Sequence, residues 1–292
     1  LHLMRRAATK KAEGATEWGR GRLLGILVAA GVVAALLLGG VGYAVYLALA
    51  GIGDDANATP GVAAGETDRS TVAQGTAHRD EIAAAPMLTV PESAAFPADK
   101  ASETAPTIKI PAGTGVNGPG FVMTGFPHTP EGAIGQLAQI DTAVLQSMSL
   151  QTAQEVYNTW ALPGGVSAED WWITVSVRAF LTSTDMGEVK DPSASVTLEP
   201  AAALVRGTDG PDWTVVCVLM KVTATYKQEA QIAFAHCERM QWVGGRWMVA
   251  PGAPPAPVPA TWPGTALANQ AGWRTWSTDN TTDPSYSGDE HQ

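Results

Sequence analysis

Residues 213–243 read WTVVCVLMKVTATYKQEAQIAFAHCERMQWV, and this stretch decides the fold of the chain. Its two halves are rich in β-branched and apolar residues, and the polar triplet 227–229 separates them. That composition predicts two long antiparallel strands joined by a tight turn. If the turn pivots on Lys227, then Cys217 and Cys237 face each other, because each lies ten positions from it.

The two cysteines belong to one face of this predicted hairpin, whereas Val218 and Phe234 belong to the other. Outside the cell an even number of cysteines favours a disulfide, so we predict a structural bond between Cys217 and Cys237. The alternative is a pair of free thiols that act as small apolar residues. A catalytic pair of Cys237 and the adjacent His236 is disfavoured, because neighbouring residues of a strand point to opposite faces.

Further elements are expected around the hairpin. Thr129 is a suitable N-cap, Pro130 suits the first helical turn, and apolar residues then recur at helical spacing. The expected elements are helices at 130–145, 150–160 and 171–183, and strands at 195–205, 213–226, 231–243 and 246–250. Helices followed by a meander of strands predict an α+β domain over residues 121–250, with the helices on one face of a curved antiparallel sheet.

Residues 23–49 form a continuous apolar run without a charged side chain. Its length is sufficient for a helix across a bilayer core, which takes about 20 residues. Residues 1–22 hold six Lys or Arg side chains and two acidic ones, and basic flanks favour the cytoplasmic side. We therefore predict a cytoplasmic tail at 1–22, one transmembrane helix anchored in the lipid bilayer of the cell membrane, and an extracytoplasmic remainder. The alternative is a signal sequence cleaved after Ala50.

The segment between the predicted span and the predicted domain, residues 50–120, is rich in Ala, Thr, Pro and Gly and contains one aromatic residue, Phe96. Such a segment buries too little apolar surface to offset its ordering entropy, so we predict an extracytoplasmic flexible linker. Residues 108–110 are an apolar exception, which suits either an edge strand or a short docking segment. The chain as a whole is acidic, with a net charge of −10, which disfavours direct binding of nucleic acid by the extracytoplasmic part.

The C-terminal tail, residues 251–292, begins with a proline-rich stretch that is expected to be extended. Trp262, Trp273 and Trp276 follow this stretch. Their rings either fold back onto the domain or form an exposed strip that binds a partner, so these three residues are a candidate interface.

Few residues suggest chemistry. The five histidines lack metal-ligand spacing, and the chain has neither a phosphate-binding loop nor a nucleophile elbow. His128, just before a predicted helix, is interpreted as a structural ring hydrogen-bonded near the helix entry. Asp141 is the polar exception on an apolar helix face, and it either lines a pocket or is satisfied locally. Together, His128 and Asp141 are the candidate pocket residues, and we predict no enzyme activity, cofactor or metal site.

Several motifs resemble one group of proteins. These are GFPHTPEGA at 125–133, the Gly-Gly-Arg-Trp hairpin at 244–247, the proline-rich exit, and Gly-Trp-Arg-Thr-Trp at 272–276. They are similar to uncharacterised bitopic proteins of conjugative and integrative elements of actinobacteria, the high-GC Gram-positive bacteria, over about residues 121–276. The resemblance implies an NTF2-like outer domain, similar to those of bitopic assembly factors in type IV secretion and conjugation machines. No interface residue of those assembly factors can be assigned to a position of this sequence.

Three functions follow as hypotheses, of which the third, an NTF2-like enzyme, is the least favoured. The first is a non-enzymatic, membrane-anchored scaffold of a conjugation or type IV secretion machine, whose extracytoplasmic domain contacts other channel proteins or a second copy of itself. The second is an extracytoplasmic NTF2-like module that binds a small ligand in an apolar pocket. A pocket lined by both His128 and Asp141 would favour the second or the third hypothesis, whereas a filled interior with an exposed aromatic strip would favour the first.

Overall fold

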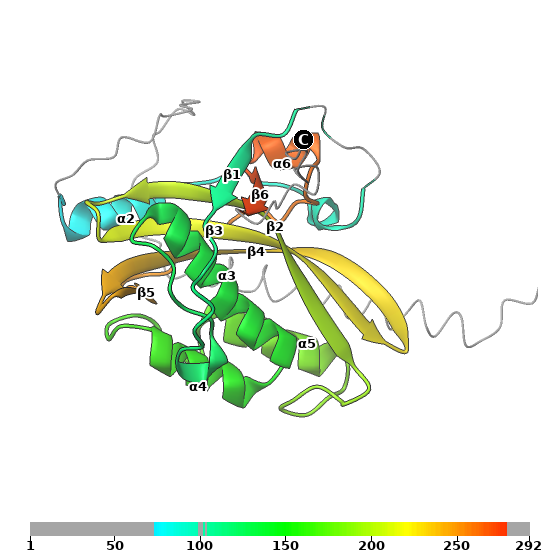
Figure 1. Ribbon diagram of the computed structural model, residues 1–292. Helices are drawn as coiled ribbons and strands as arrows, with labels where there is room; N and C mark the ends of the chain where they lie inside the picture. The colour runs from blue at the N-terminus through cyan, green and yellow to red at the C-terminus, as the bar shows by residue number, and fades with distance from the viewer. Residues whose placement is uncertain (1–72, 99–101, 103, 279–292) are drawn as a thin grey trace, which may run out of the picture.

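The computed structural model describes residues 73–98, 102 and 104–278. The described chain is an α+β fold built on one curled six-stranded sheet (Figure 1). The sheet has the order β1-β6-β2-β3-β4-β5, and β1 and β6 pair in parallel whereas the other neighbours are antiparallel. The strands are β1 (Thr107–Ile110), β2 (Ser195–Thr208), β3 (Trp213–Tyr226), β4 (Gln228–Val243), β5 (Arg246–Val249) and β6 (Arg274–Thr278).

The helices fall into two groups along the chain. Three of them follow one another directly before β2, namely α3 (Pro130–Ser147), α4 (Leu150–Trp160) and α5 (Trp172–Ser183). The remaining helical segments are α2 (Thr76–Ala84), η1 (Glu92–Ala95), η2 (Pro119–Phe121) and α6 (Ala266–Gln270). The predicted start of α3 is confirmed, since the Thr129 hydroxyl accepts a hydrogen bond from the N–H of Gly132 at 3.1 Å.

The predicted hairpin register is confirmed. Tyr226 pairs with Gln228 across Lys227, which adopts a left-handed φ of 61°, and Cys217 pairs with Cys237. The two cysteines form a disulfide. The register is well determined because the helix-facing side of this hairpin is apolar, and a slip by one residue would turn those side chains to the opposite face.

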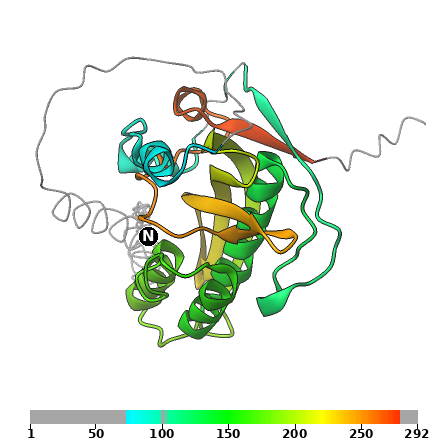
Figure 2. The same cartoon turned by 90° about the vertical axis from the view of Figure 1, so that its left-hand side faces the viewer.

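Both faces of the sheet are covered (Figures 1 and 2). The helices α3, α4 and α5 lie against one face, as the sequence predicts. The opposite face, which carries the disulfide, is covered by α2, η1 and the segment 251–273. Two contacts place this cover, because Ala256 N–H donates to Ala83 O and Trp262 N–H donates to Ala94 O. The prediction that helices cover one face alone is therefore incomplete.

The predicted linker over residues 50–120 is wrong for its C-terminal part. Helix α2 is held by long-range hydrogen bonds to Asp209, and β1 is an edge strand paired with β6. Ile110 of β1 is almost completely buried. Local composition does not indicate this order, because α2 has little amphipathic pattern and is stabilised by polar contacts with distant residues. The edge-strand interpretation of residues 108–110 is confirmed.

The predicted C-terminal boundary of the domain, residue 250, is too early. Strand β6 lies in the predicted tail and pairs with β1 and β2 in the same sheet. Within residues 73–98, 102 and 104–278, no helix is long and apolar enough to cross a membrane. The predicted span at 23–49, the basic tail at 1–22 and the cleavage position after Ala50 lie outside the described residues.

Candidate functional site

The strongest concentration of chemically versatile side chains is a buried cluster between α3 and β4. Asp141 points from the sheet-facing side of α3, and both of its carboxylate oxygens lie 3.0 Å from Nδ1 of His236. Asp141 is fully buried, and the side chain of His236 is 3% exposed. His236 shares its strand face with Phe234 and Met240, which is why it meets the helix rather than the disulfide side.

The second ring nitrogen of His236 is also occupied. Its Nε2 lies 3.3 Å from a carboxylate oxygen of Glu238, two residues along the same strand face. The same oxygen accepts a hydrogen bond from the indole N–H of Trp171 at 3.1 Å, and the other oxygen accepts one from the Arg239 backbone N–H. The cluster is thus a continuous path from Asp141 through His236 and Glu238 to Trp171, with every charged group bonded.

The two carboxylates determine how the histidine titrates. Burial alone would lower the pKa of His236, but the adjacent Asp141, with help from Glu238, outweighs burial and raises the pKa to about 10. The imidazole is therefore a cation at neutral pH. Burial raises the pKa of Asp141, and the charge of His236 opposes that rise. Burial and the charge of Glu238 raise the pKa of the nearby Tyr157 to about 12.

This arrangement stabilises structure and does not present a reactive group. A general base needs a free nitrogen within hydrogen-bond reach of a substrate, and both ring nitrogens of His236 already face carboxylates. A buried cation between two carboxylates instead joins α3 to the middle of the sheet. Within the described parts of the chain, no group of three or more His, Cys, Asp or Glu side chains has a geometry that could hold a metal ion.

The two candidate pocket residues lie in separate contacts. His128 Nε2 lies 2.7 Å from a carboxylate oxygen of Asp212, and its ring stacks on Trp242 with a centroid distance of 4.5 Å. Asp141 is bonded to His236 instead. Both residues are thus satisfied by protein partners, and the structure does not bring them together in one pocket.

The three tail tryptophans fold back onto the domain. Trp273 is 1% exposed, and its indole N–H donates to Pro259 O at 3.0 Å. Trp262 and Trp276 are partly buried and pack against the main core, and Trp276 lies in β6. Of the candidate interface residues, Trp273 is therefore inaccessible to a partner in this conformation.

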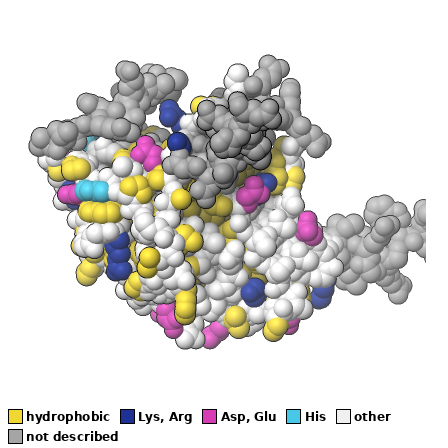
Figure 3. Space-filling view, in the orientation of Figure 1, with side chains coloured by type: hydrophobic (Ala, Val, Ile, Leu, Met, Phe, Trp, Pro, Cys, Tyr) yellow, Lys and Arg dark blue, Asp and Glu magenta, His cyan; other side chains and the backbone are white. Residues whose placement is uncertain are grey.

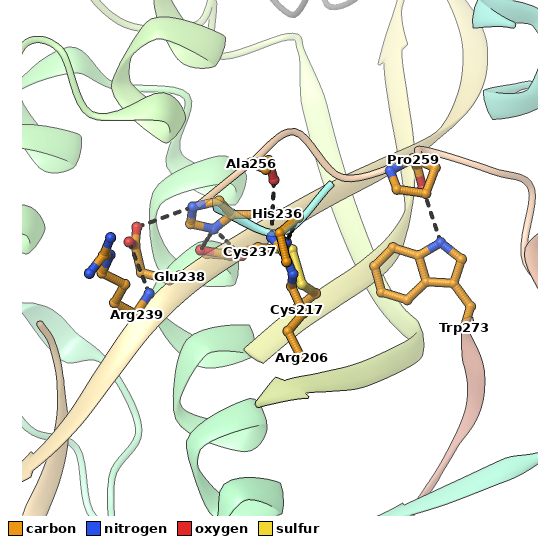
Figure 4. Close-up of a disulfide and its surroundings, with 11 residues drawn as sticks. Arg206, Cys217, His236, Cys237, Glu238, Arg239, Ala256, Pro259 and Trp273 are labelled. Carbon is orange, nitrogen blue, oxygen red and sulfur yellow. Dashed lines mark hydrogen bonds and ion pairs between the residues drawn. A yellow bond between two sulfur atoms is a disulfide. The ribbon is translucent and has the colours of Figure 1, made fainter. Parts of the chain in front are cut away.

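The disulfide lies on the face opposite to the ionic cluster, under the returning tail (Figure 4). Cys217 is fully buried and Cys237 nearly so. Two arginines of this face bond to tail carbonyls. Arg239 donates through Nε to Ala253 O at 2.7 Å, and Arg206 donates to Ala256 O at 3.3 Å. The cover over the disulfide is thus fixed by side chains of the sheet.

Sequence reasoning missed the pairing of Asp141 with His236. Two patterns could have indicated it. Strand alternation places His236 on the helix-facing side of β4, and helical spacing places Asp141 on the same inner face as Leu137 and Leu145. A buried acid and a buried histidine on facing elements would be expected to pair, because either group alone is costly in an apolar interior.

Comparison with models of protein families gave no match, and neither did comparison with curated proteins or with solved structures.

Proposed function

We propose that this protein is a non-enzymatic, membrane-anchored scaffold whose extracytoplasmic domain makes protein–protein contacts. The observation that carries the proposal is the filled interior between the helices and the sheet. Large side chains occupy it and are less than 2% exposed, among them Trp160, Trp171, Phe180, Ile140 and Leu137. Among the described residues, the charged side chains at its centre, Asp141, His236 and Glu238, are paired with one another. An interior of this kind leaves the outer surface as the site of interaction.

The finer assignment is to a conjugation or type IV secretion-like machine, with the domain in the NTF2-like class. The helix-then-meander order and the curled sheet around α3 support the NTF2-like part of the proposal. The motifs at 125–133, 244–247 and 272–276 support the conjugation part through their resemblance to bitopic proteins of conjugative elements. The apolar run at 23–49 supports the membrane anchor.

A small-ligand-binding module is the less favoured alternative. The residues that would have marked its pocket, His128 and Asp141, are engaged with Asp212 and His236.

The face in view in Figure 3 carries scattered acidic and basic side chains with no single-sign field, which supports protein partners over nucleic acid.

The test is chemical crosslinking of the full chain in its native membrane, followed by mass spectrometry of the adducts. We expect adducts between the extracytoplasmic domain and subunits of a secretion or conjugation channel, or a second copy of this chain. A matched sample with the domain unfolded by denaturant before crosslinking controls for random proximity. Failure to recover any channel subunit would overturn the assignment to such a machine.

A further inference from the structure

The loop between β1 and α3 forms a small hairpin that projects from the domain. Thr124 N–H donates to Val116 O at 2.9 Å, and Gly118 N–H donates to Val122 O at 2.8 Å. The tip of the hairpin is the short η2 turn, Pro119–Phe121. This turn contacts α4, so the hairpin lies on the helix side of the sheet and α2 lies on the other side (Figures 1 and 2).

Phe121, at the tip of the hairpin, adopts an unfavourable backbone conformation. Its φ is 59°, in the left-handed region that suits glycine and strains a bulky residue, and the preceding Gly120 has a φ of 66°. The Phe121 side chain is 89% exposed, so burial within the domain does not offset this strain. An aromatic ring that is both strained and exposed indicates a role outside the folding of its own domain.

The loop backbone on both sides of Phe121 is fixed by hydrogen bonds from the body of the domain. Three buried side chains on α3, α4 and β5 donate to loop carbonyls spaced four residues apart. These bonds run from Trp160 Nε1 to Pro119 O at 3.0 Å, from Gln136 Nε2 to Met123 O at 3.0 Å, and from Trp247 Nε1 to Pro127 O at 2.9 Å. A loop that is fixed in this way loses little conformational entropy when it binds.

The surroundings of Phe121 suit an apolar protein pocket. Residues 111–127 contain no charged side chain, and Val116 on the same hairpin is 60% exposed. Loops and helices that bind lipid surfaces usually combine apolar residues with Lys or Arg, which this loop lacks. A single projecting ring flanked by a smaller apolar residue is instead typical of an anchor at the centre of a protein interface.

We propose that Phe121 is a preformed docking knob that inserts into an aromatic-sized apolar pocket on a partner protein. The knob consists of Phe121 with Val116 beside it, on the hairpin 116–124. The inference rests on the proposed scaffold function, because it names the surface through which a partner is contacted. The partner is recognised by an uncharged pocket lined with aliphatic or aromatic side chains.

The first experiment places photoreactive p-benzoylphenylalanine at position 121 of the full chain in its native membrane. Lys227 is the matched control position, because it is also exposed, at a hairpin tip and at positive φ. We expect illumination to give a discrete protein adduct from position 121, attached to an apolar segment of the partner, and none from position 227. Adducts to lipid or to this chain itself, or no adduct, would overturn the docking proposal.

The second experiment separates docking from folding through Phe121→Asn and Lys227→Asn. Asparagine tolerates positive φ, so both variants should raise the Tm of the chain by about 2–4 °C. Only Phe121→Asn should lower recovery of the partner in crosslinking, by about tenfold or more. Unchanged recovery with Phe121→Asn would refute the knob and leave the scaffold function standing. Absence of any partner for the unmodified chain would instead refute the scaffold function.

Discussion

The two faces of the sheet are covered by different means. On one face, α3, α4 and α5 are consecutive in sequence and pack through apolar side chains around the buried Asp141–His236–Glu238 cluster. On the other face, two segments from opposite ends of the described chain, 73–98 and 251–273, combine polar contacts to side chains of the sheet with buried apolar groups, among them Ala83 and Trp273. The helix face is covered by consecutive elements that share one core, whereas α2, at the start of the other cover, buries only Ala83 and depends on individual bonds to Asp209.

This difference predicts whether the loss of one contact destabilises the whole domain or releases one segment locally. Removing one contact from the helix side disturbs a core that is shared by every element, so the whole domain should lose stability. Removing one contact from the α2 side should release a segment locally, since the segment has few other buried groups. The following predictions test that contrast, from the largest expected effect to the smallest.

The largest effect is expected from Asp141→Ala. The substitution leaves the His236 cation buried with only Glu238 as its partner, and breaking a buried ion pair typically costs about 3–5 kcal/mol. Urea unfolding of a fragment that starts after the predicted span would measure the loss. Asp212→Ala is the control, because the Asp212–His128 pair is partly exposed and should change stability by less than about 1 kcal/mol. Equal effects of the two variants would contradict the structural role of the cluster.

The same cluster predicts a loss of stability in alkaline solution. The pKa of His236 is raised to about 10 in the folded state from its ordinary value of 6.5, so folding favours the protonated ring. This stabilisation is complete below pH 6.5 and is lost as the pH rises to about 10. The raised pKa of Tyr157, about 12, extends the loss above pH 10. Unfolding free energies measured from pH 6 to 10 should decline, and the double variant His236→Gln with Asp141→Asn should remove that decline because it removes both coupled groups, whereas an equally steep decline in the double variant would contradict the assignment.

The next effect is expected from the disulfide. The bond closes a loop between residues 20 positions apart, and its removal should cost about 3 kcal/mol through the freer unfolded chain. The double variant Cys217→Ala and Cys237→Ala should show this loss in denaturant unfolding. Reductant should destabilise the unmodified fragment by a similar amount and leave the double variant unaffected. A variant that still responds to reductant would show that another group is responsible.

A smaller and local effect is expected from Asp209→Ala. The buried Asp209 carboxylate accepts hydrogen bonds from the N–H groups of Gln74 and Gly75 and from Arg79 Nε, so its loss frees the start of α2. We expect a cost of about 1–3 kcal/mol in the opening of this segment. Hydrogen exchange should become faster in residues 75–85 and stay unchanged in α3. Faster exchange in both places would mean that the two faces are not independent.

The smallest effect is a gain in stability. Phe121→Asn replaces a strained residue at positive φ with one that tolerates this conformation, and it removes no buried contact. We expect stabilisation of about 1 kcal/mol in thermal unfolding of the same fragment. A loss of stability would show that the Phe121 ring contributes to folding, contrary to its exposure.

The features that could be predicted are those that depend on neighbours in sequence. Alternation and the turn at Lys227 predicted the hairpin register and hence the Cys217–Cys237 bond. Capping chemistry at Thr129 predicted the start of α3. In the candidate site, the sequence drew attention to Asp141 as either a pocket residue or a locally satisfied one, without identifying its distant partner. It also placed His236 on the strand face away from the cysteines without identifying its partner.

The sequence by itself therefore determined the elements from α3 to β5, the hairpin register and the composition of the helix-facing core, because periodicity and turn chemistry act over a few residues. The tertiary structure alone decided the buried pair between Asp141 and His236, the cover over the disulfide and the addition of β1 and β6 to the sheet. The Asp141–His236 pair spans 95 positions and the Arg79–Asp209 pair spans 130. Such contacts depend on the paths of intervening elements through space, and a local pattern does not contain that information.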